Sequence, residues 1–218
     1  EAVESFLRQD IESKELIIFN DTPKQEVRID HPDILVVNSP YRYRNLGEKL
    51  NAAFGLASGE YLCRFDDDDI SLPWRLSYSI SRMEELGVGY YRPKRMWFKN
   101  GSIINGPNGK AYNTGPMWTR ELFDEVGGFR HMGSGQDVEY ETDAKKHQNR
   151  SVWYNEPDDK LFYVYRWGAG TGMHLSGFGR GIAGYNRIGR LPRKEGIYEI
   201  DPKWKLDYVA ETEKLWRK

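Results

Sequence analysis

Four consecutive aspartates, residues 66–69, follow directly on the short strand-like segment of residues 61–65. Carboxylates this close raise one another's pKa and destabilise a fold unless a cation lies among them. In an extended segment alternate side chains point to the same side, so Asp66 and Asp68 are expected to face one way. Two such carboxylates form an oxygen site suited to Mg²⁺ or Mn²⁺. The run therefore predicts a divalent metal site at the end of a strand.

Two other interpretations of the acidic run were weighed. A solvated acidic turn before a helix would use Asp69 only to complement the positive end of the helix dipole. An EF-hand is a poor match, because the glycine at loop position six and the glutamate at position twelve are both absent. The carboxyl ends of parallel strands are where open α/β sheets bind their ligands, which favours the metal site.

Strand-like and helix-like segments alternate through the first two-thirds of the chain. Residues 16–19 and 34–37 are continuous apolar runs, each followed by a turn signal, as is typical of buried parallel strands. Helical spacing marks residues 2–8 and 46–57, and Pro73 opens another helix after the acidic run. This rhythm predicts an α/β domain with a mainly parallel sheet flanked by helices.

The later part of the chain has a looser pattern. Asn100 and Gly101 predict a tight hairpin between residues 96–98 and 102–104. We expect helices at residues 119–126, 136–147 and 203–217, and strands at 151–154 and 161–165. Residues 167–194 hold eight glycines, five Arg or Lys residues and no Asp or Glu. We expect this segment to be a lid that closes over an anionic ligand.

Composition excludes several classes of protein. Lys and Arg total 32 against 33 for Asp and Glu, so the charge balance gives no general reason to bind nucleic acid or an anionic membrane. Cys63 is the single cysteine, which excludes an intrachain disulfide and a cysteine metal cluster. No apolar run approaches the ~18 residues needed to span a bilayer, and no signal peptide is visible. We expect a cytoplasmic location, with peripheral association at the cytoplasmic membrane face left open, and no nucleic-acid partner.

Several motifs stand in an order and spacing that resemble the core of family 2 glycosyltransferases, which are nucleotide-sugar enzymes of the GT-A fold. They lie at residues 20–22, 46–53, 57–61, 65–69, 72–73, 118–123, 126–129 and 135–137. The resemblance covers roughly residues 1–175. The chain departs from the family in two places. The apolar strand that normally comes first is missing, so the chain opens on the helix that should follow it, and Gln136 replaces the usual glutamate.

The resemblance implies a role for each of these positions. Asp21 would bind the base, a uracil, and Lys49 and Asn51 would lie near the nucleotide. Asp66 and Asp67 would contact the donor, and Asp66, Asp68 and His174 would hold the metal. Asp137 would be the general base, and Trp118 and Gln136 would contact the acceptor. Trp97 and Trp167 are further candidates for stacking on sugar rings, although core packing is the alternative for each tryptophan.

The resemblance implies one GT-A-like catalytic domain over residues 1–218. Its nucleotide-sugar-binding half would be residues 1–92 and its acceptor half residues 93–166, followed by the Gly/Arg-rich segment and a closing helix. The expected function is Mn²⁺- or Mg²⁺-dependent transfer from a UDP-sugar to a glycan or glycolipid acceptor, with inversion because one base and no second nucleophile are evident. A nucleotidyltransferase and a non-catalytic sugar-binding protein remain alternatives. The sequence leaves the oligomeric state open.

Overall fold

The computed structural model describes residues 1–101, 103–108, 115–167 and 195–217. The helices are α1 (Ala2–Leu7), α2 (Leu46–Phe54), α3 (Arg75–Leu86), α4 (Arg120–Val126), α5 (Gln136–Gln148) and α7 (Tyr208–Trp216), with a 3-10 turn η1 (Asp158–Lys160). The strands of the first half are β1 (Leu16–Asn20), β2 (Gln25–Arg28), β3 (Ile34–Asn38), β4 (Tyr61–Cys63), β5 (Ile70–Ser71) and β6 (Tyr90–Pro93). Those of the second half are β7 (Met96–Asn100), β8 (Ile103–Asn108), β9 (Met117–Thr119), β10 (Trp153–Tyr154), β11 (Tyr163–Trp167) and β12 (Gly196–Glu199). No helix of the described part of the chain is both long and apolar enough to cross a membrane.

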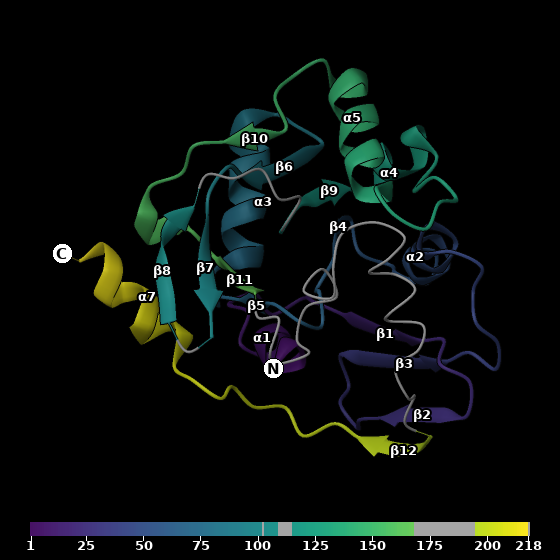
Figure 1. Cartoon of the computed structure of the whole chain (residues 1–218). Coiled ribbons are helices and arrows are strands. Elements are labelled where there is room, and N and C mark those ends of the chain that lie inside the picture. Colours follow the sequence, from purple (N-terminus) through teal and green to yellow (C-terminus); the bar gives the residue numbers. More distant parts are fainter. Residues whose placement is uncertain (102, 109–114, 168–194, 218) are drawn as a thin grey trace.

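The expected α/β fold class is confirmed, with a more even mixture of strand directions than the sequence predicts. Parallel pairing joins β1 to β3, β10 to β6, β11 to β7 and β12 to β2. Antiparallel pairing joins β4 and β6 to β9, β5 to β11, and β7 to β8. The last of these is the predicted hairpin, with Asn100 opposite Ile103. Strands from both expected halves of the chain therefore share sheets (Figure 1).

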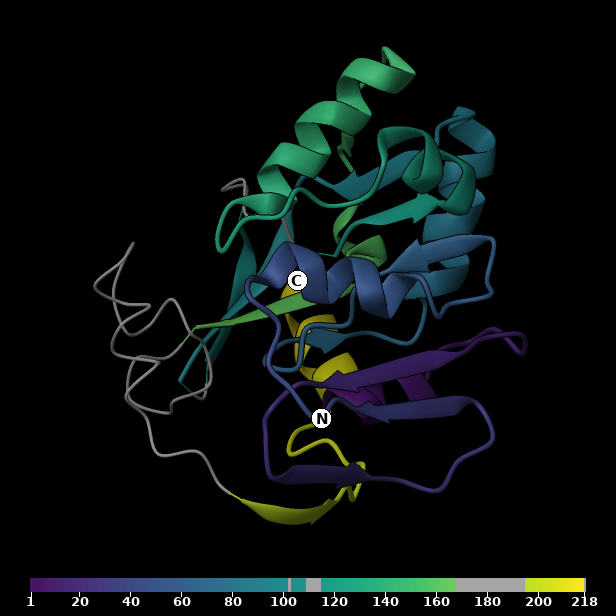
Figure 2. The ribbon, with the colours of Figure 1, turned by 90° about the vertical axis from the view of Figure 1, so that its right-hand side faces the viewer.

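Adjacent residues of the central strands pack into two different hydrophobic cores, because strand side chains alternate between the faces of a sheet. On β6, Tyr90 enters the core shared with α2, α4 and α5, while Tyr91 enters the core shared with α3. On β9, Trp118 and Met117 divide in the same way. The sheet is consequently covered by helices on both faces, as Figure 2 shows.

A cavity of about 850 Å³ separates β1 from β4. Each is the last strand of its own sheet among the described residues, so their facing edges have no strand partner there. Residues of β1, β4, α1, α2 and α3 line the cavity, and most of them are apolar. This explains why residues 16–19 are only half-buried although they form a continuous apolar run.

Two glycines bring α2 against the loop that follows α4. A Cβ on Gly47 would lie 2.0 Å from the carbonyl oxygen of Arg130, so no other residue fits there without moving the backbone. Gly128 has a φ of +73°, and a Cβ there would lie 2.7 Å from Oδ1 of Asn51. Both glycines belong to motifs that carried the family resemblance. The structure therefore joins two of these motifs by direct contact.

Several boundaries and strands differ from the sequence expectations. The helix after the acidic run begins at Arg75, and Ile70–Ser71 form a short strand instead. The closing helix begins at Tyr208, because Asp207 caps it by accepting a hydrogen bond from the backbone N–H of Ala210 at 3.0 Å. Strands β2, β6, β9 and β12 were not predicted.

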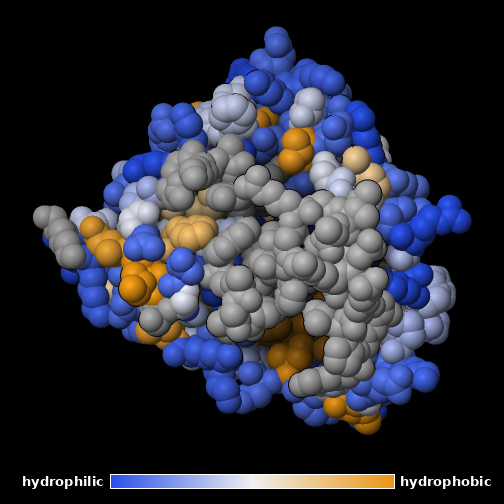
Figure 3. Space-filling model, viewed as in Figure 1, coloured by the Kyte–Doolittle hydropathy of each residue, from blue (hydrophilic) through white to orange (hydrophobic). Residues whose placement is uncertain are grey.

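The Gly/Arg-rich segment lies outside the described residues beyond β11, and so does its expected role as a lid. Around it, Figure 3 shows hydrophilic side chains over most of the visible face. Hydrophobic side chains gather on the side formed by β8 and α7, where Ile103 is exposed.

Candidate functional site

The four aspartates form a turn, so the expectation of an extended run is wrong. The backbone N–H of Asp69 donates to the carbonyl of Asp66 at 3.4 Å, and Asp67 and Asp68 occupy the turn between them. The alternation of side chains along a strand therefore does not place Asp66 and Asp68 on one side. What brings the four carboxylates into one region is the tightness of the turn. It lies beyond the end of β4 and leads into β5.

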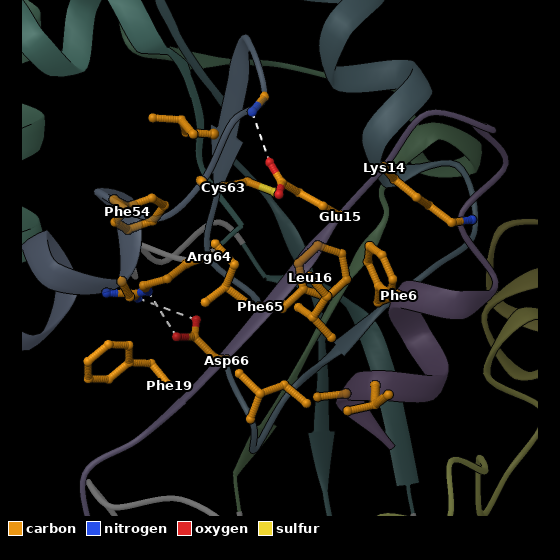
Figure 4. A pocket seen from close by; sticks show the side chains of 18 of the residues that line it. Phe6, Lys14, Glu15, Leu16, Phe19, Phe54, Cys63, Arg64, Phe65 and Asp66 are labelled. Carbon is orange, nitrogen blue, oxygen red and sulfur yellow. Dashed lines mark hydrogen bonds and ion pairs between the residues drawn. The ribbon is translucent and has the colours of Figure 1, made fainter. Parts of the chain in front are cut away.

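Asp66 is held by two partners from different parts of the chain. Arg64 Nε lies 2.9 Å from Oδ1 of Asp66, and its Nη2 donates to Oδ2 at 3.3 Å. The hydroxyl of Tyr163 donates to the same Oδ2 at 2.9 Å. Burial works to raise the pKa of Asp66, but the charge of Arg64 and the Tyr163 hydrogen bond hold that pKa below its ordinary value. Arg64 and Tyr163 therefore favour the ionised form of Asp66, and Figure 4 shows Arg64 pointing toward it.

Asp69 is buried and holds a proton more tightly than an ordinary aspartate. Burial, together with the charges of Asp66 and Asp68, raises the pKa of Asp69 to about 8. The Tyr163 hydroxyl lies 2.8 Å from Oδ2 of Asp69, and the backbone N–H of Arg166 donates to Oδ1 at 2.7 Å. A phenol has one proton to donate, so it cannot serve Asp66 and Asp69 together unless Asp69 brings its own. Asp69 thus fits a structural role better than a metal-binding one.

Asp68 also holds a proton more tightly than an ordinary aspartate. Burial, followed by the charges of Asp67 and Asp66, raises the pKa of Asp68 to about 7. The Arg166 guanidinium donates to the backbone carbonyl of Asp68 and pairs with the Glu1 carboxylate at 2.5 Å. Arg166 thereby fixes the turn without neutralising its carboxylates fully.

The raised pKa values of Asp68 and Asp69 bear on whether the turn could hold a divalent cation. Carboxylates with raised pKa values need either protons or a cation, and hard cations such as Mg²⁺ prefer oxygen ligands. Asp66, Asp67 and Asp68 carry such oxygens and so suit a hard cation by ligand type. No cluster of three or more His, Cys, Asp or Glu side chains in metal-binding geometry is present in the described part of the chain. Further ligands would have to come from a bound diphosphate and water. His174 lies outside the described residues.

A second polar group lies at the ends of β1 and β3. Lys49 Nζ donates to Oδ1 of Asp21 at 2.7 Å, and the backbone N–H of Tyr43 donates to Oδ2 at 3.2 Å. Burial works to raise the pKa of Asp21, but Lys49 and the Tyr43 N–H hold it below its ordinary value. The Phe19 ring packs edge-on against Tyr43 at 5.5 Å between ring centroids. The predicted pair Asp21 and Lys49 therefore meets in an ionised, hydrogen-bonded contact beside aromatic rings.

The 850 Å³ cavity connects these two polar groups. Lys49 and Phe19 line it toward the first group, and Arg64, Asp66 and Asp67 line it toward the acidic turn. That these residues share one functional site stays a prediction.

Asn51 and Trp118 have packing roles in the structure. Asn51 Nδ2 donates to the carbonyl of Phe129 at 2.8 Å, and Oδ1 accepts from the Phe129 backbone N–H at 2.8 Å. The backbone of a loop thus engages its amide, and its expected place near the nucleotide stays a prediction. Trp118 is 1% exposed and packs among Phe54, Tyr90 and Tyr140, so its ring offers no free face to a sugar. Trp97 is buried as well, and the side chain of Trp167 lies outside the description.

Asp137 stands in the first turn of α5, behind Gly135 with a φ of +79°. Its Oδ1 accepts from the backbone N–H of Val138 at 2.9 Å. Asp137 and Arg64 line a second, small cavity of about 10 Å³. Burial works to lower the pKa of Arg64, but Asp66 and then Asp137 raise it above its ordinary value. Arg64 therefore pairs with Asp66 of the acidic turn and lines the small cavity together with Asp137. Gln136 is buried, with its Oε1 unpaired among the described residues.

Arg64, Tyr163 and Arg166 are site residues that sequence reasoning missed. Arg64 lies two residues before Asp66, and a basic residue this close to four acids was a readable signal. Tyr163 and Arg166 come from β11, about a hundred residues later, and nothing in their local pattern marks them.

Comparison with known proteins identifies the family and similar folds. Residues 1–136 match the sequence model of the family described as Glycosyl transferase family 2. A crystal structure of S. aureus TarS 1-349 is similar, with a TM-score of 0.57 and 16% identity over 75% of this chain and 55% of that one. The TarS 1-349 complex with UDP-GlcNAc has a TM-score of 0.58 and 16% identity over 78% of this chain and 55% of that one.

A crystal structure described simply as S. aureus TarS has a TM-score of 0.57 and 17% identity over 76% of this chain and 33% of that one. The chain thus spans about half the length of the TarS 1-349 structures it matches, or less of the longer one. Identities this low show the fold alone. A search of curated proteins found no match.

Proposed function

The chain belongs to glycosyl transferase family 2, and on that premise we propose that it transfers a sugar from a UDP-sugar to a glycan or lipid-linked acceptor. The TarS structures include complexes with UDP and with UDP-GlcNAc, which supports a uridine nucleotide sugar as donor. The similarity in fold supports this choice of donor class and leaves the sugar itself open.

One observation carries the proposal: Arg64 lies beside both Asp137 and Asp66 of the acidic turn. Glycosyl transfer needs a group that stabilises the leaving diphosphate and a base that takes the acceptor proton, a short distance apart. Asp66, Asp67 and Asp68 are assigned to the first task and Asp137 to the second. Lys49, which lines the cavity, and its ion-pair partner Asp21 are assigned to the base of the nucleotide.

In the proposed reaction, the acceptor hydroxyl attacks the anomeric carbon of the sugar. The new C–O bond forms to the acceptor as the C–O bond to the diphosphate breaks, and Asp137 takes the hydroxyl proton. A divalent cation held by Asp66 and Asp68 would stabilise the charge on the leaving diphosphate. A single displacement with one base inverts the anomeric carbon. Retention would require a second nucleophile, and we assign none.

The test is a thermal-shift screen of nucleotide sugars with and without Mn²⁺, followed by an assay of donor hydrolysis. A ligand that binds only the native state raises its melting temperature by mass action. We expect a UDP-sugar to shift the melting temperature when Mn²⁺ is present, and to be hydrolysed slowly in an Mn²⁺-dependent manner. Binding without turnover would indicate a non-catalytic sugar-binding protein. A response to nucleoside triphosphates with release of pyrophosphate would indicate a nucleotidyltransferase.

The remaining expectations belong to the same proposal. The acceptor is a glycan or a lipid-linked glycan of polysaccharide biosynthesis, met in the cytoplasm or at the cytoplasmic face of the membrane. Nucleic acid is not a partner. Gln136 is proposed to contact the acceptor beside Asp137, because it is adjacent in the first turn of α5.

A further inference from the structure

Arg64 lies between the two groups that the proposed transfer uses, yet that reaction assigns it no task. Its side chain is largely buried, with 18% exposed. It belongs to the wall of the large cavity on one side and to the small cavity with Asp137 on the other. Arg64 thus lies beside Asp66 and Asp137, which the proposed reaction uses to hold the cation and to take the acceptor proton.

The Asp66 carboxylate is fully engaged in the structure. Arg64 contacts both of its oxygens, through Nε at 2.9 Å and Nη2 at 3.3 Å, and Tyr163 adds a hydrogen bond to Oδ2 at 2.9 Å. A divalent cation that takes Asp66 as a ligand must therefore replace at least one of these contacts. Because the cation repels the guanidinium, Arg64 is the partner of Asp66 that the cation displaces.

Tyr163 is the less movable of the two partners. It is 2% exposed, its hydroxyl also lies 2.8 Å from Asp69, and the Arg75 guanidinium packs over its ring at 5.5 Å from the centroid. Arg64 has a long side chain with several rotatable bonds and a wall of the large cavity beside it. Displacement of Arg64 costs the packing less than displacement of a buried ring.

Asp137 offers the guanidinium a second partner. The small cavity between them, about 10 Å³, is near the size of one water molecule. Trp118 Nε1 and the Tyr140 hydroxyl, both from residues of its wall, have no hydrogen-bond partner among the described residues. The Tyr140 hydroxyl can accept a hydrogen bond from a guanidinium, whereas the Trp118 N–H is a donor only and cannot.

We propose that Arg64 is a positioning residue, an internal counter-ion that holds Asp66 when no divalent cation is bound and turns to Asp137 when Asp66 binds one. In the first state it keeps the carboxylate in place. In the second it fixes the orientation of the base. This inference rests on the proposed function, and it couples the metal half of the site to the acceptor half.

The experiment measures Mn²⁺ binding to the whole chain by electron paramagnetic resonance of the free ion. Arg64→Gln removes the competing charge, and we expect it to bind Mn²⁺ about tenfold more tightly than the wild type. Arg64→Lys keeps the charge and should bind close to the wild-type affinity. Arg28→Gln makes the same charge change at an exposed ion pair on β2, and should bind as the wild type does.

Two double variants isolate the partners of Arg64. In the Asp66→Asn background, Arg64→Gln should no longer tighten Mn²⁺ binding, because the contested carboxylate is gone. Asp137→Asn should weaken Mn²⁺ binding when Arg64 is present and have a much smaller effect in Arg64→Gln. Circular dichroism melting of each variant confirms that it is folded. A purely structural Arg64 would give none of these couplings.

The outcomes separate the two proposals. If the wild type binds Mn²⁺ and folded Arg64→Gln binds it equally or more weakly, the role of Arg64 is refuted while the proposed function stands. An equal gain in Arg28→Gln, or an undiminished gain in the Asp66→Asn background, refutes it as well. A wild type that binds no Mn²⁺ refutes both this inference and the metal dependence of the proposed transfer.

Discussion

Asn51 and Phe129 form a reciprocal hydrogen-bonded pair, in which the amide of Asn51 both donates to the Phe129 carbonyl and accepts from the Phe129 N–H, each at 2.8 Å. The pair mimics one step of a β-ladder between a helix side chain and a loop. It ties α2, which carries Lys49, to the loop that leads to α5 and Asp137. The two ends of the proposed site are thereby held in a fixed relation.

Replacement of Asn51 should therefore destabilise the fold. Asn51→Ala leaves the backbone N–H and C=O of Phe129 without their partners, and we expect the free energy of unfolding to fall by about 1–3 kcal/mol. Urea denaturation measures this change. Asn51→Asp keeps the hydrogen-bond acceptor but loses the donor. Its free energy of unfolding should lie between those of the wild type and Asn51→Ala. A loss of nucleotide affinity at unchanged stability would instead place Asn51 at the donor.

The local elements of the fold follow from the sequence, whereas the pairings between distant strands do not. The apolar runs of β1 and β3 predict strands, because a parallel strand that is buried on both faces has a continuous apolar sequence. Strand β2, with the sequence Gln25 to Arg28, has a single apolar residue, Val27, and pairs with β12 from the far end of the chain. No local pattern encodes such a pairing.

The same division applies to the site. The acidic turn, Asp21 with Lys49, and Asp137 were found because each sits in a motif with a local signature. Tyr163, which lies between Asp66 and Asp69, is one tyrosine in an ordinary apolar strand. Trp118 was expected to bind sugar because aromatic residues serve both roles, and burial, which the sequence does not report, assigned it to the core.

The stability of the metal-free protein should fall as pH rises. The pKa values of Asp68 and Asp69 are raised to about 7 and about 8, from ordinary values of 3.8. The folded state thus binds these protons more tightly than the unfolded chain does. The stabilisation is complete below about pH 4 and is lost as pH rises through the two raised values.

We expect a lower melting temperature at pH 8.5 than at pH 6 in the presence of a chelator, measured by calorimetry. Mn²⁺ should reduce the difference, because a cation compensates the ionised carboxylates. Asp69→Asn, which needs no proton, should show a shallower dependence. An identical pH slope in the wild type and in Asp69→Asn would contradict the assignment of a proton to Asp69.

The base end of the site is tested through Asp21. Asp21→Asn removes the charge that pairs with Lys49 at 2.7 Å while keeping the shape of the side chain. We expect UDP affinity to fall by about tenfold, the equivalent of about 1.4 kcal/mol, in isothermal titration calorimetry. Asp33→Asn, on an exposed turn, is the matched control. Equal UDP affinity in all three proteins would remove Asp21 from the donor site.

Asp137 is tested by a change that preserves its volume. Asp137→Asn removes the proton acceptor, and we expect the rate of sugar transfer to fall by about 10²–10⁴-fold. UDP-sugar affinity should change little, because Asp137 is assigned to the acceptor. Asp143→Asn, on the same helix and paired with Arg130, serves as the control. If donor affinity falls as far as the rate does, Asp137 belongs to the donor side.

Asp68 gives a prediction in which stability and binding move in opposite directions. Its carboxylate is partly buried near Asp66 and Asp67, and its pKa of about 7 reports the cost of ionising it there. Asp68→Asn removes that cost, so the metal-free protein should melt on the order of 5 °C higher at pH 8.5. The same change removes a proposed ligand, so the Mn²⁺-dependent shift caused by UDP should shrink or disappear. Asp67→Asn, at an exposed position of the turn, should stabilise the metal-free protein less. A variant that gains stability and keeps the full Mn²⁺-dependent shift would show that Asp68 is a strained carboxylate with no part in holding a cation.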